Sequence, residues 1–318
     1  MQVITDLASC PHPEKGCAVS IGVYDGVHLG HRLLIEKLKQ EAKRLSIPSA
    51  VVTFDPHPAT VVRPESAPKL LSPLSRKLEL LSETGIDYVV VIKFDKNRAK
   101  ETAEEFISQV ILGCLHSKVV VIGQDFRFGY KRAGDVDLLK KVGETSGFEV
   151  VPFGLVQDLQ DGQPISSTRI RDLIKKGDVD SATKLLKRPP EVIGEIVHGD
   201  ARGAKLGFPT ANFRISKEVL VPRIGIYAGF FKGEDAIERP AAISVGIRPT
   251  FYENKANTQD EELVPLVEAY VLDFNGNLYG QKAKLTFNKR LRDERQFDSS
   301  QDLVTQMEAD IEYVRSIL

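Results

Sequence analysis

Residues 18–45 read AVSIGVYDGVHLGHRLLIEKLKQEAKRL, and this stretch decides the fold of the first half of the chain. The β-branched run at Ala18–Gly22 predicts a strand, and a glycine-rich turn follows it. From His31 to Leu45 the apolar residues recur every three or four positions, which predicts an amphipathic helix. Glycines between a strand and a helix let backbone N–H groups approach a negatively charged ligand at the helix N-terminus.

The same alternation of strand and helix continues to about residue 152. Helices are expected at Pro73–Ser82 and Ala103–Val110. The further expected strands are Ala50–Phe54, Tyr88–Phe94, Lys118–Ile122 and Glu149–Pro152. This order predicts an α/β domain with a mostly parallel sheet and helices on both faces. Such sheets bind ligands at the carboxyl ends of their strands.

The second half has a different pattern. After helices expected at Thr168–Lys176 and Val179–Leu186, two prolines follow a basic pair at Lys187–Pro190, which predicts domains at residues 1–187 and 188–318. Short alternating segments between turn residues predict a small antiparallel barrel, and they are Glu191–His198, Ile226–Phe231, Ala241–Gly246, Val267–Phe274 and Gln281–Asn288. A terminal helix is expected after Ser299 and Ser300, with an apolar stripe at Leu303, Met307, Ile311, Val314 and Leu318.

Composition excludes several classes of protein. The 318 residues hold 43 basic and 44 acidic side chains, a net charge of −1, so we expect no broad basic face and no nucleic-acid partner. No apolar run reaches about 20 residues and the start lacks the pattern of a secretory signal, so we expect no membrane partner. The three cysteines, Cys10, Cys17 and Cys114, lack metal-ligand spacing. They predict a reducing, cytoplasmic location with neither a disulfide nor a zinc site.

The turn at residues 22–31 is the first candidate site. His28 and His31 lie three residues apart where the strand enters the helix, and each can donate a hydrogen bond to a phosphate oxygen. Nucleotidyl transfer needs such donors because charge builds on the α- and β-phosphates as pyrophosphate leaves. The alternative is a glycine-rich turn with two incidental surface histidines.

Three further segments follow predicted strands or precede a helix. His57 lies between two prolines at residues 54–58, and the alternative there is a stiff turn. The segment Gly123–Gly129 alternates aromatic and charged residues, which suits contact with a planar ring, although one of its two phenylalanines is expected in the core. Hydroxyls at residues 166–168 with Arg171 one turn later suit a phosphate, although helix capping alone explains the hydroxyls.

Two segments in the second half carry polar groups. A loop with glycines and basic residues leads to Thr210 and Asn212, whose side-chain oxygens suit Mg²⁺ bound to a nucleotide. Glu268 falls on one face of a predicted strand with Tyr270 and Leu272, as a catalytic base or a surface charge. The sequence has no Walker A pattern.

Taken together, these segments resemble the prokaryotic bifunctional riboflavin kinase/FAD synthetase family over nearly the whole chain and in the same order. The resemblance implies an N-terminal FMN adenylyltransferase domain of Rossmann-like nucleotidyltransferase fold. It also implies a C-terminal flavokinase domain, a six-stranded antiparallel β-barrel with a closing helix.

Family roles carried onto matching positions give two sets of site residues. At the adenylyl site, His28 and His31 are catalytic, and the resemblance implies ATP contacts at Gly22, Asp25, Gly26, Ser166, Ser167, Thr168 and Arg171. Flavin or nucleotide contacts there are implied for His57, Asp125 and Phe128. At the kinase site, Glu268 is the implied base, Arg292 contacts the flavin, and the ATP contacts are Gly199, Lys205, Gly207, Thr210 and Asn212. Thr210 and Asn212 are the implied Mg²⁺ ligands, while Ala204 and Ser244 depart from the residues common in the family.

The resulting hypothesis is an enzyme that phosphorylates riboflavin to FMN with Mg·ATP and then adenylylates FMN to FAD. Its expected partners are the small-molecule substrates riboflavin, FMN and ATP, and it is expected to be a monomer or a transient oligomer. Two alternatives remain. The chain could have only one of the two activities, or it could be a flavin- or nucleotide-binding regulator without turnover.

Overall fold

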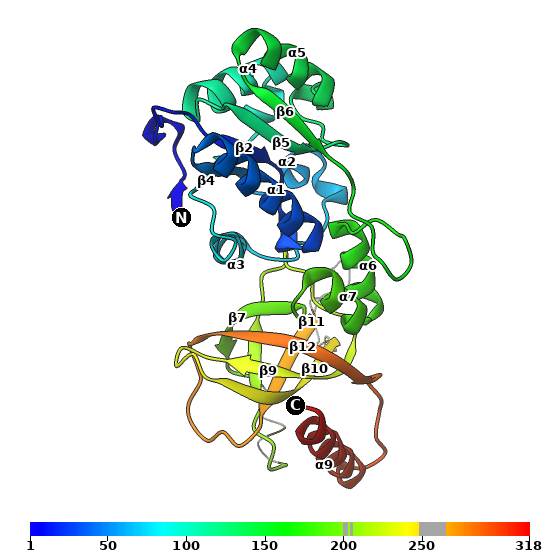
Figure 1. Cartoon of the computed structure of the whole chain (residues 1–318). Helices are drawn as coiled ribbons and strands as arrows, with labels where there is room; N and C mark the ends of the chain where they lie inside the picture. The colour runs from blue at the N-terminus through cyan, green and yellow to red at the C-terminus, as the bar shows by residue number, and fades with distance from the viewer. Residues whose placement is uncertain (200–202, 204–205, 248–264) are drawn as a thin grey trace. The chain divides into compact units, whose positions relative to one another are not determined.

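The β-branched segments of the first half form a six-stranded sheet in which every neighbouring pair is parallel. The computed structural model describes residues 1–199, 203, 206–247 and 265–318. The strand order is β1-β4-β3-β2-β5-β6 (Figure 1). The bounds are β1 (Gln2–Ile4), β2 (Ala18–Ile21), β3 (Ser49–Asp55), β4 (Tyr88–Lys93), β5 (Val119–Gly123) and β6 (Glu149–Phe153). The predicted parallel sheet is confirmed, and β1 is an additional edge strand of three residues.

Helices cover both faces of this sheet, as predicted. Val51 and Val52 of β3 point to opposite faces of the sheet. Val51 packs in a cluster with Leu80 of α3, and Val52 packs in a different cluster with Ile107 of η5. The helices are α1 (Leu29–Leu45), α2 (Pro58–Val62), α3 (Leu74–Ser82), α4 (Ala103–Phe106), the π-helix η5 (Ile107–Cys114) and α5 (Val136–Ser146). Short 3-10 turns are η1 (Leu7–Ser9), η2 (Asp25–Val27), η3 (Pro64–Ser66), η4 (Arg98–Lys100) and η6 (Tyr130–Arg132).

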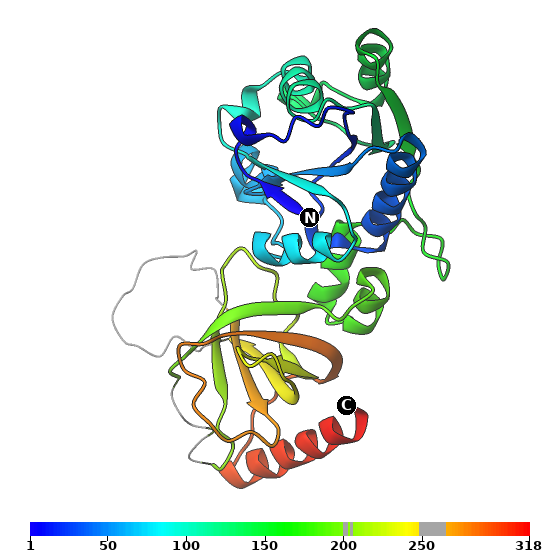
Figure 2. The same cartoon turned by 60° about the vertical axis from the view of Figure 1, so that its left-hand side comes forward.

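The second half forms a closed six-stranded antiparallel barrel in the order β10-β11-β8-β7-β12-β9. Its strands are β7 (Glu191–Val197), β8 (Ala211–Arg214), β9 (Gly225–Lys232), β10 (Glu238–Ile247), β11 (Pro265–Val271) and β12 (Lys282–Arg292). The helices α6 (Ser167–Lys176) and α7 (Val179–Leu186) precede it. The terminal helix α9 (Ser300–Ile317) lies against the barrel (Figure 2). Its residues Ile311 and Val314 form one hydrophobic cluster with Ala228 of β9 and with Leu272, which follows β11. The predicted barrel and closing helix are confirmed.

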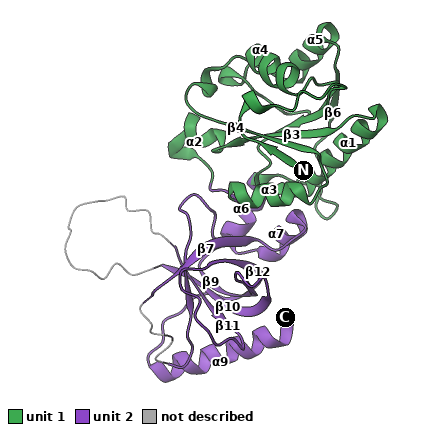
Figure 3. Ribbon diagram, turned by 90° about the vertical axis from the view of Figure 1, so that its left-hand side faces the viewer, with its two compact units in different colours: residues 1–68, 73–167 green, residues 69–72, 168–318 purple. Residues whose placement is uncertain are grey.

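Contacts divide the chain into two compact units (Figure 3). The first unit is residues 1–68 with 73–167, and the second is residues 69–72 with 168–318. Helix α7 and most of α6 therefore belong to the second unit. The domain boundary at Lys187 stays a prediction.

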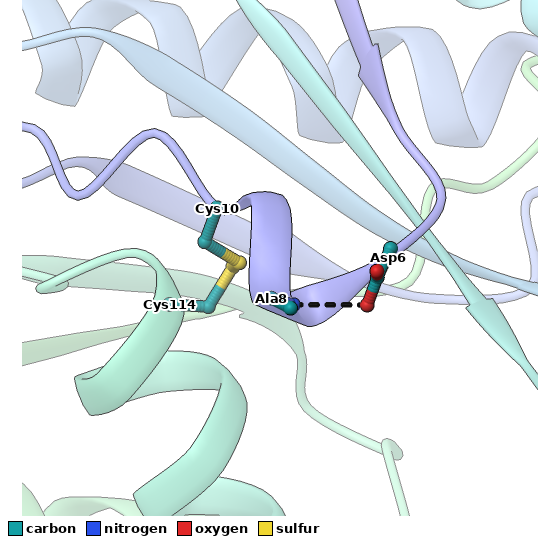
Figure 4. The surroundings of a disulfide bond; sticks show 4 residues. All are labelled: Asp6, Ala8, Cys10 and Cys114. Carbon is teal, nitrogen blue, oxygen red and sulfur yellow. Dashed lines mark hydrogen bonds between the residues drawn. A yellow bond between two sulfur atoms is a disulfide. The ribbon is translucent and has the colours of Figure 1, made fainter.

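A disulfide bond joins Cys10 to Cys114, 104 residues away in the sequence (Figure 4). The prediction of a chain without a disulfide is therefore wrong. The fold brings the segment after η1 against the end of η5, and cysteine spacing carries no sign of such a long-range contact. Cys17 is a buried free thiol. Among the described residues, no helix combines the length and apolar character that a membrane span requires, and the cytoplasmic location stays a prediction.

Candidate active sites

The glycine-rich turn of the first unit lies at the carboxyl end of β2 and leads directly into α1. Gly26 has a φ of 77°, a left-handed conformation that glycine adopts without strain. His28 is the N-cap of α1, and its Nδ1 accepts a hydrogen bond from the backbone N–H of His31 at 3.4 Å. The two imidazole rings stack with centroids 3.6 Å apart. The fold therefore brings both predicted catalytic histidines together at a helix N-terminus.

His31 has the electrostatics of a neutral imidazole. Burial lowers the pKa of His31 well below its ordinary value, and the charges of His28 and Lys77 act in the same direction. Its ring lies 5.1 Å from that of Tyr24. The Nδ1 atom of His31 is buried and has no hydrogen-bond partner among the described residues. A neutral imidazole retains one N–H group and one acceptor nitrogen, so this site can offer a hydrogen bond without adding positive charge.

The hydroxyl segment at residues 166–168 meets the turn through Ser167. Its Oγ donates to the backbone oxygen of Asp25 at 3.0 Å, and the Asp25 side chain is buried. Ser166, Ser167, Gly22, Asp25 and Gly26 all belong to the first unit. Thr168 and Arg171 belong to the second unit, where Arg171 Nε donates to the backbone oxygen of Lys69 at 2.7 Å. The ATP contacts of this set stay predictions.

The other predicted contacts of the first unit have different surroundings. His57 is the N-cap of α2, and its Nδ1 accepts from the backbone N–H of Ala59 at 3.1 Å. Asp125 is exposed. Phe128 is buried against Phe106, with ring centroids 5.7 Å apart. The partly buried Phe126 packs against the same core and stacks on Phe128 with ring centroids 5.4 Å apart, so both phenylalanines contact the core. The ligand contacts of all three predicted residues stay predictions.

A lysine that the sequence analysis did not single out lies beneath the turn of the first unit. Lys77 of α3 is only 6 % exposed, and its Nζ donates to the backbone oxygens of Val23 and Phe54. Its position carried a signal, because it falls on the apolar face of α3 with Leu74, Leu78 and Leu81.

The second unit has a cavity of about 370 Å³ against the outer face of its barrel. Glu268 and Tyr270 line this cavity, whereas Val267, Ala269 and Val271 of the same strand are buried in the barrel core. The predicted alternation along β11 is confirmed. Facing side chains on α9 and the segment before it form an apolar wall, which consists of Phe297, Leu303, Met307 and Ile311. Apolar walls with a few polar groups suit a planar ligand.

Asn212 is the residue opposite Glu268 in the register of β8 and β11. Directly opposite residues of neighbouring strands point to the same face, so the amide and the carboxylate are neighbours. Asn212 is only 6 % exposed, and its Oδ1 has no hydrogen-bond partner among the described residues. A Cβ placed on Gly199 would lie 2.4 Å from Asn212 Nδ2, so glycine there permits this close approach. A buried oxygen without a partner fits a cation ligand.

The remaining predicted kinase-site residues are distributed as follows. Thr210 and Ser244 line the cavity, and Ser244 is the residue opposite Glu268 in the register of β10 and β11. Gly207 is exposed. Lys205 and Ala204 lie outside the described residues. The ATP contacts at this site stay predictions.

Arg292 lies at the end of β12 and is bound by a carboxylate of α9. Its Nε contacts both oxygens of Asp310 at 3.1 Å, and its Nη2 lies 2.6 Å from Oδ2. Gln306 donates to the same carboxylate at 2.8 Å. Sequence reasoning missed Asp310, although an acid among Met307, Ile311 and Val314 on an apolar stripe is a signal of a paired charge. The flavin contact of Arg292 stays a prediction.

Comparisons with known proteins match both units. A family model described as FAD synthetase matches residues 10–169, and one described as riboflavin kinase matches residues 186–318. The bifunctional riboflavin kinase/FMN adenylyltransferase of Haemophilus influenzae is 35 % identical over 99 % of both chains. The enzyme of the same description from Escherichia coli is 35 % identical over 94 % of this chain and 91 % of its own.

A solved structure from Streptococcus pneumoniae, described as a macrolide-efflux protein, has the same fold over the whole chain. It aligns with a TM-score of 0.84 at 30 % identity, and the match covers 99 % of this chain and 98 % of that one. The full-length relatives and the two family models confirm the resemblance drawn from the motifs. This chain therefore belongs to the bifunctional riboflavin kinase/FMN adenylyltransferase family.

Proposed function

We propose that the second unit phosphorylates riboflavin to FMN and that the first unit adenylylates FMN to FAD, each with ATP. The observation that carries the proposal is a separate polar site in each unit, with a buried polar atom that has no hydrogen-bond partner within the described ranges of the chain. In the first unit this atom is His31 Nδ1 and in the second it is Asn212 Oδ1. Each lies beside a group able to assist phosphoryl chemistry, His28 in one site and Glu268 in the other.

In the kinase reaction, Glu268 accepts the proton of the riboflavin 5′-hydroxyl. The hydroxyl oxygen attacks the γ-phosphorus of ATP, and the bond from that phosphorus to the β–γ bridging oxygen breaks to release ADP. The position of Glu268 on a cavity wall supports this role. The apolar side chains of α9 would hold the flavin ring and exclude water from the reacting atoms.

Mg²⁺ is the cation proposed for this site. Asn212 Oδ1 and the Thr210 hydroxyl are oxygen ligands of the kind that Mg²⁺ prefers. Oδ1 accepts no hydrogen bond from the residues that the structure describes, which supports the assignment. Mg²⁺ bound to ATP neutralises charge on the phosphates. These two side chains would then fix the nucleotide relative to Glu268.

In the adenylyl transfer, a phosphate oxygen of FMN attacks the α-phosphorus of ATP and pyrophosphate leaves. The step needs no covalent protein nucleophile, because in-line placement and hydrogen-bond donors suffice. The stacked His28 and His31 at the N-terminus of α1 support a role in stabilising the charge that develops on the phosphates.

The two activities can be separated by substitution in the full-length chain. His28→Ala with His31→Ala should abolish FAD formation while FMN accumulates from riboflavin. Glu268→Ala should give little FMN from riboflavin, yet it should form FAD from supplied FMN. Chromatography of flavins after incubation with ATP and Mg²⁺ measures both products.

The same assay tests the alternatives. A parent chain that converts only riboflavin or only FMN would have one activity. Flavin binding without ATP consumption would indicate a regulator. A histidine double variant that adenylylates FMN at the parent rate would contradict the role assigned to the turn.

A further inference from the structure

Lys77 is a buried cation whose three donor hydrogens match three acceptors. Its Nζ lies 3.0 Å from the backbone oxygen of Phe54, 3.1 Å from Thr53 Oγ1 and 3.2 Å from the backbone oxygen of Val23. An ammonium group has three hydrogens to donate. Lysine is seldom buried unless its charge and its hydrogens are satisfied. Its three donors are engaged by protein oxygens, so Lys77 is placed to hold protein groups and not a phosphate.

The three acceptors lie where two neighbouring strands end. Val23 follows β2 and begins the turn that carries His28, and Phe54 is near the end of β3, just before the loop that carries His57. Thr53 Oγ1 also donates to the Val23 oxygen at 2.9 Å, so the threonine and the lysine bind the same carbonyl. One ammonium group therefore fixes the origins of two segments that sequence analysis assigned to the adenylyl site.

The charge of Lys77 also acts on His31. Burial lowers the pKa of Lys77, and the Asp25 and Asp55 carboxylates act in the opposite direction by favouring the cation. The lysine charge is one of the causes that lower the pKa of His31, after burial and His28. The rings of His28 and Tyr24 lie beside the His31 ring, and the Lys77 cation acts on it electrostatically.

We propose that Lys77 is a positioning residue for FMN adenylylation, which holds the glycine-rich turn and the His57 loop in the arrangement that the transfer requires. The inference rests on the adenylyltransferase function proposed for the first unit. Because Lys77 contacts backbone and Thr53 oxygens, its loss should misplace His28 and His31 relative to the α-phosphate. The effect should therefore appear in kcat more than in the KM for ATP.

The test compares FMN adenylylation with Mg·ATP by the full-length parent chain and by its Lys77→Met variant. Methionine keeps the approximate length of the side chain and removes the ammonium. We expect kcat to fall about 10- to 100-fold, the range for misplaced or lost transition-state donors, with KM for ATP within about threefold of the parent. Riboflavin kinase activity in the same preparation should be unchanged and shows that the second unit is folded.

Leu81→Ala is the matched control, because Leu81 is a fully buried residue of the same helix that touches neither strand end through a hydrogen bond. It should lower the thermal midpoint of the first unit at least as much as Lys77→Met, yet retain the parent kcat below that midpoint. Thr53→Val removes one acceptor with little change in shape, and it should lower kcat in the same direction by a smaller factor.

The dependence of kcat on pH distinguishes a positioning role of Lys77 from a purely structural one, because loss of stability alone would not shift it. Removing a nearby positive charge raises the pKa of a histidine, so the acid limb of kcat should shift to higher pH in Lys77→Met and stay in place in Leu81→Ala. A Lys77→Met kcat within twofold of the parent, or equal losses in both variants at equal stability, overturns the inference. A parent chain that forms no FAD from FMN overturns the proposed function itself.

Discussion

The two sites place their polar groups in different parts of a β-structure. In the first unit the histidines lie beyond the end of β2, on a turn whose shape depends on the groups that hold it. In the second unit Glu268 and Asn212 lie within neighbouring strands, where the register of the ladder sets their separation. A substitution beneath the turn should therefore spread over the whole first site, whereas one in the barrel should act locally.

The largest effect should come from the base of the second site. Glu268→Gln keeps the size of the side chain but removes the carboxylate that we propose accepts the hydroxyl proton, so kinase kcat should fall about 10²- to 10⁴-fold. Adenylylation of supplied FMN should not change. Initial rates with riboflavin and with FMN measure both, and parallel losses of the two activities would contradict independent sites.

Asn212→Leu should separate activity from stability. It removes a proposed Mg²⁺ ligand, so kinase activity should fall about 100-fold and need more Mg²⁺. The free energy of unfolding should stay the same or rise, because Asn212 Oδ1 is buried without a partner in the part of the chain that the structure describes, and such burial costs about 1–3 kcal/mol. Kinase rates over a Mg²⁺ titration, with chemical unfolding of the same variant, measure the two effects. A clear loss of stability would mean that Oδ1 has a structural role.

Breaking the pair between Arg292 and Asp310 should loosen one wall of the cavity. Asp310→Asn leaves a half-buried guanidinium with weaker acceptors, so the unfolding free energy should fall by about 1–3 kcal/mol and the KM for riboflavin should rise about tenfold. The matched control is Asp273→Asn, since Asp273 pairs with Arg315 of the same helix at a largely exposed position. That change should lower the unfolding free energy less than Asp310→Asn does and leave KM unaltered, because an exposed ion pair contributes little to stability. Equal effects would show that Asp310 has no special role.

The smallest effect concerns the stability of the first unit in mild acid. The folded pKa of His31 lies below its unfolded value of about 6.5, so the unfolded chain binds more protons as the pH falls. The contribution of neutral His31 is therefore present above about pH 6.5 and is lost on acidification, by at most about 1.4 kcal/mol per pH unit. Chemical unfolding at about pH 7 and about pH 5.5 should show a steeper loss in the parent than in His31→Gln. Equal slopes would contradict a depressed pKa.

The contiguous parts of the first site could be predicted from the sequence. Strand, glycines, histidines and helix follow one another within residues 18–45, so local periodicity and turn chemistry place His28 and His31 correctly. Lys77 lies more than 40 residues later on a short helix. The pairing of β2 with β3 and the packing of α3 against η2 bring its ammonium under the turn. Sequence motifs describe residues that are close in the sequence, so they do not predict a contact between distant segments.

The second site could be predicted less completely, because it too depends on contacts between segments that are distant in the sequence. Period-two alternation correctly places Glu268 away from the barrel core. The register that puts Asn212 opposite it depends on β8, a strand of only four residues that is absent from the strands expected from the sequence. The salt bridge between Arg292 and Asp310 joins a strand to a helix. The disulfide joins two cysteines that are separated in the sequence by the strands β2, β3 and β4. Long-range partners of this kind are fixed by topology.

The third cysteine decides what oxidation can do to this chain. Burial, together with the charge of Asp87, raises the pKa of the Cys17 thiol to about 12. Only a thiolate attacks a disulfide sulfur, so the raised pKa disfavours attack by Cys17 at neutral pH. Burial of the Cys17 thiol acts in the same direction. Both features therefore protect the bond between Cys10 and Cys114 from exchange with the third cysteine.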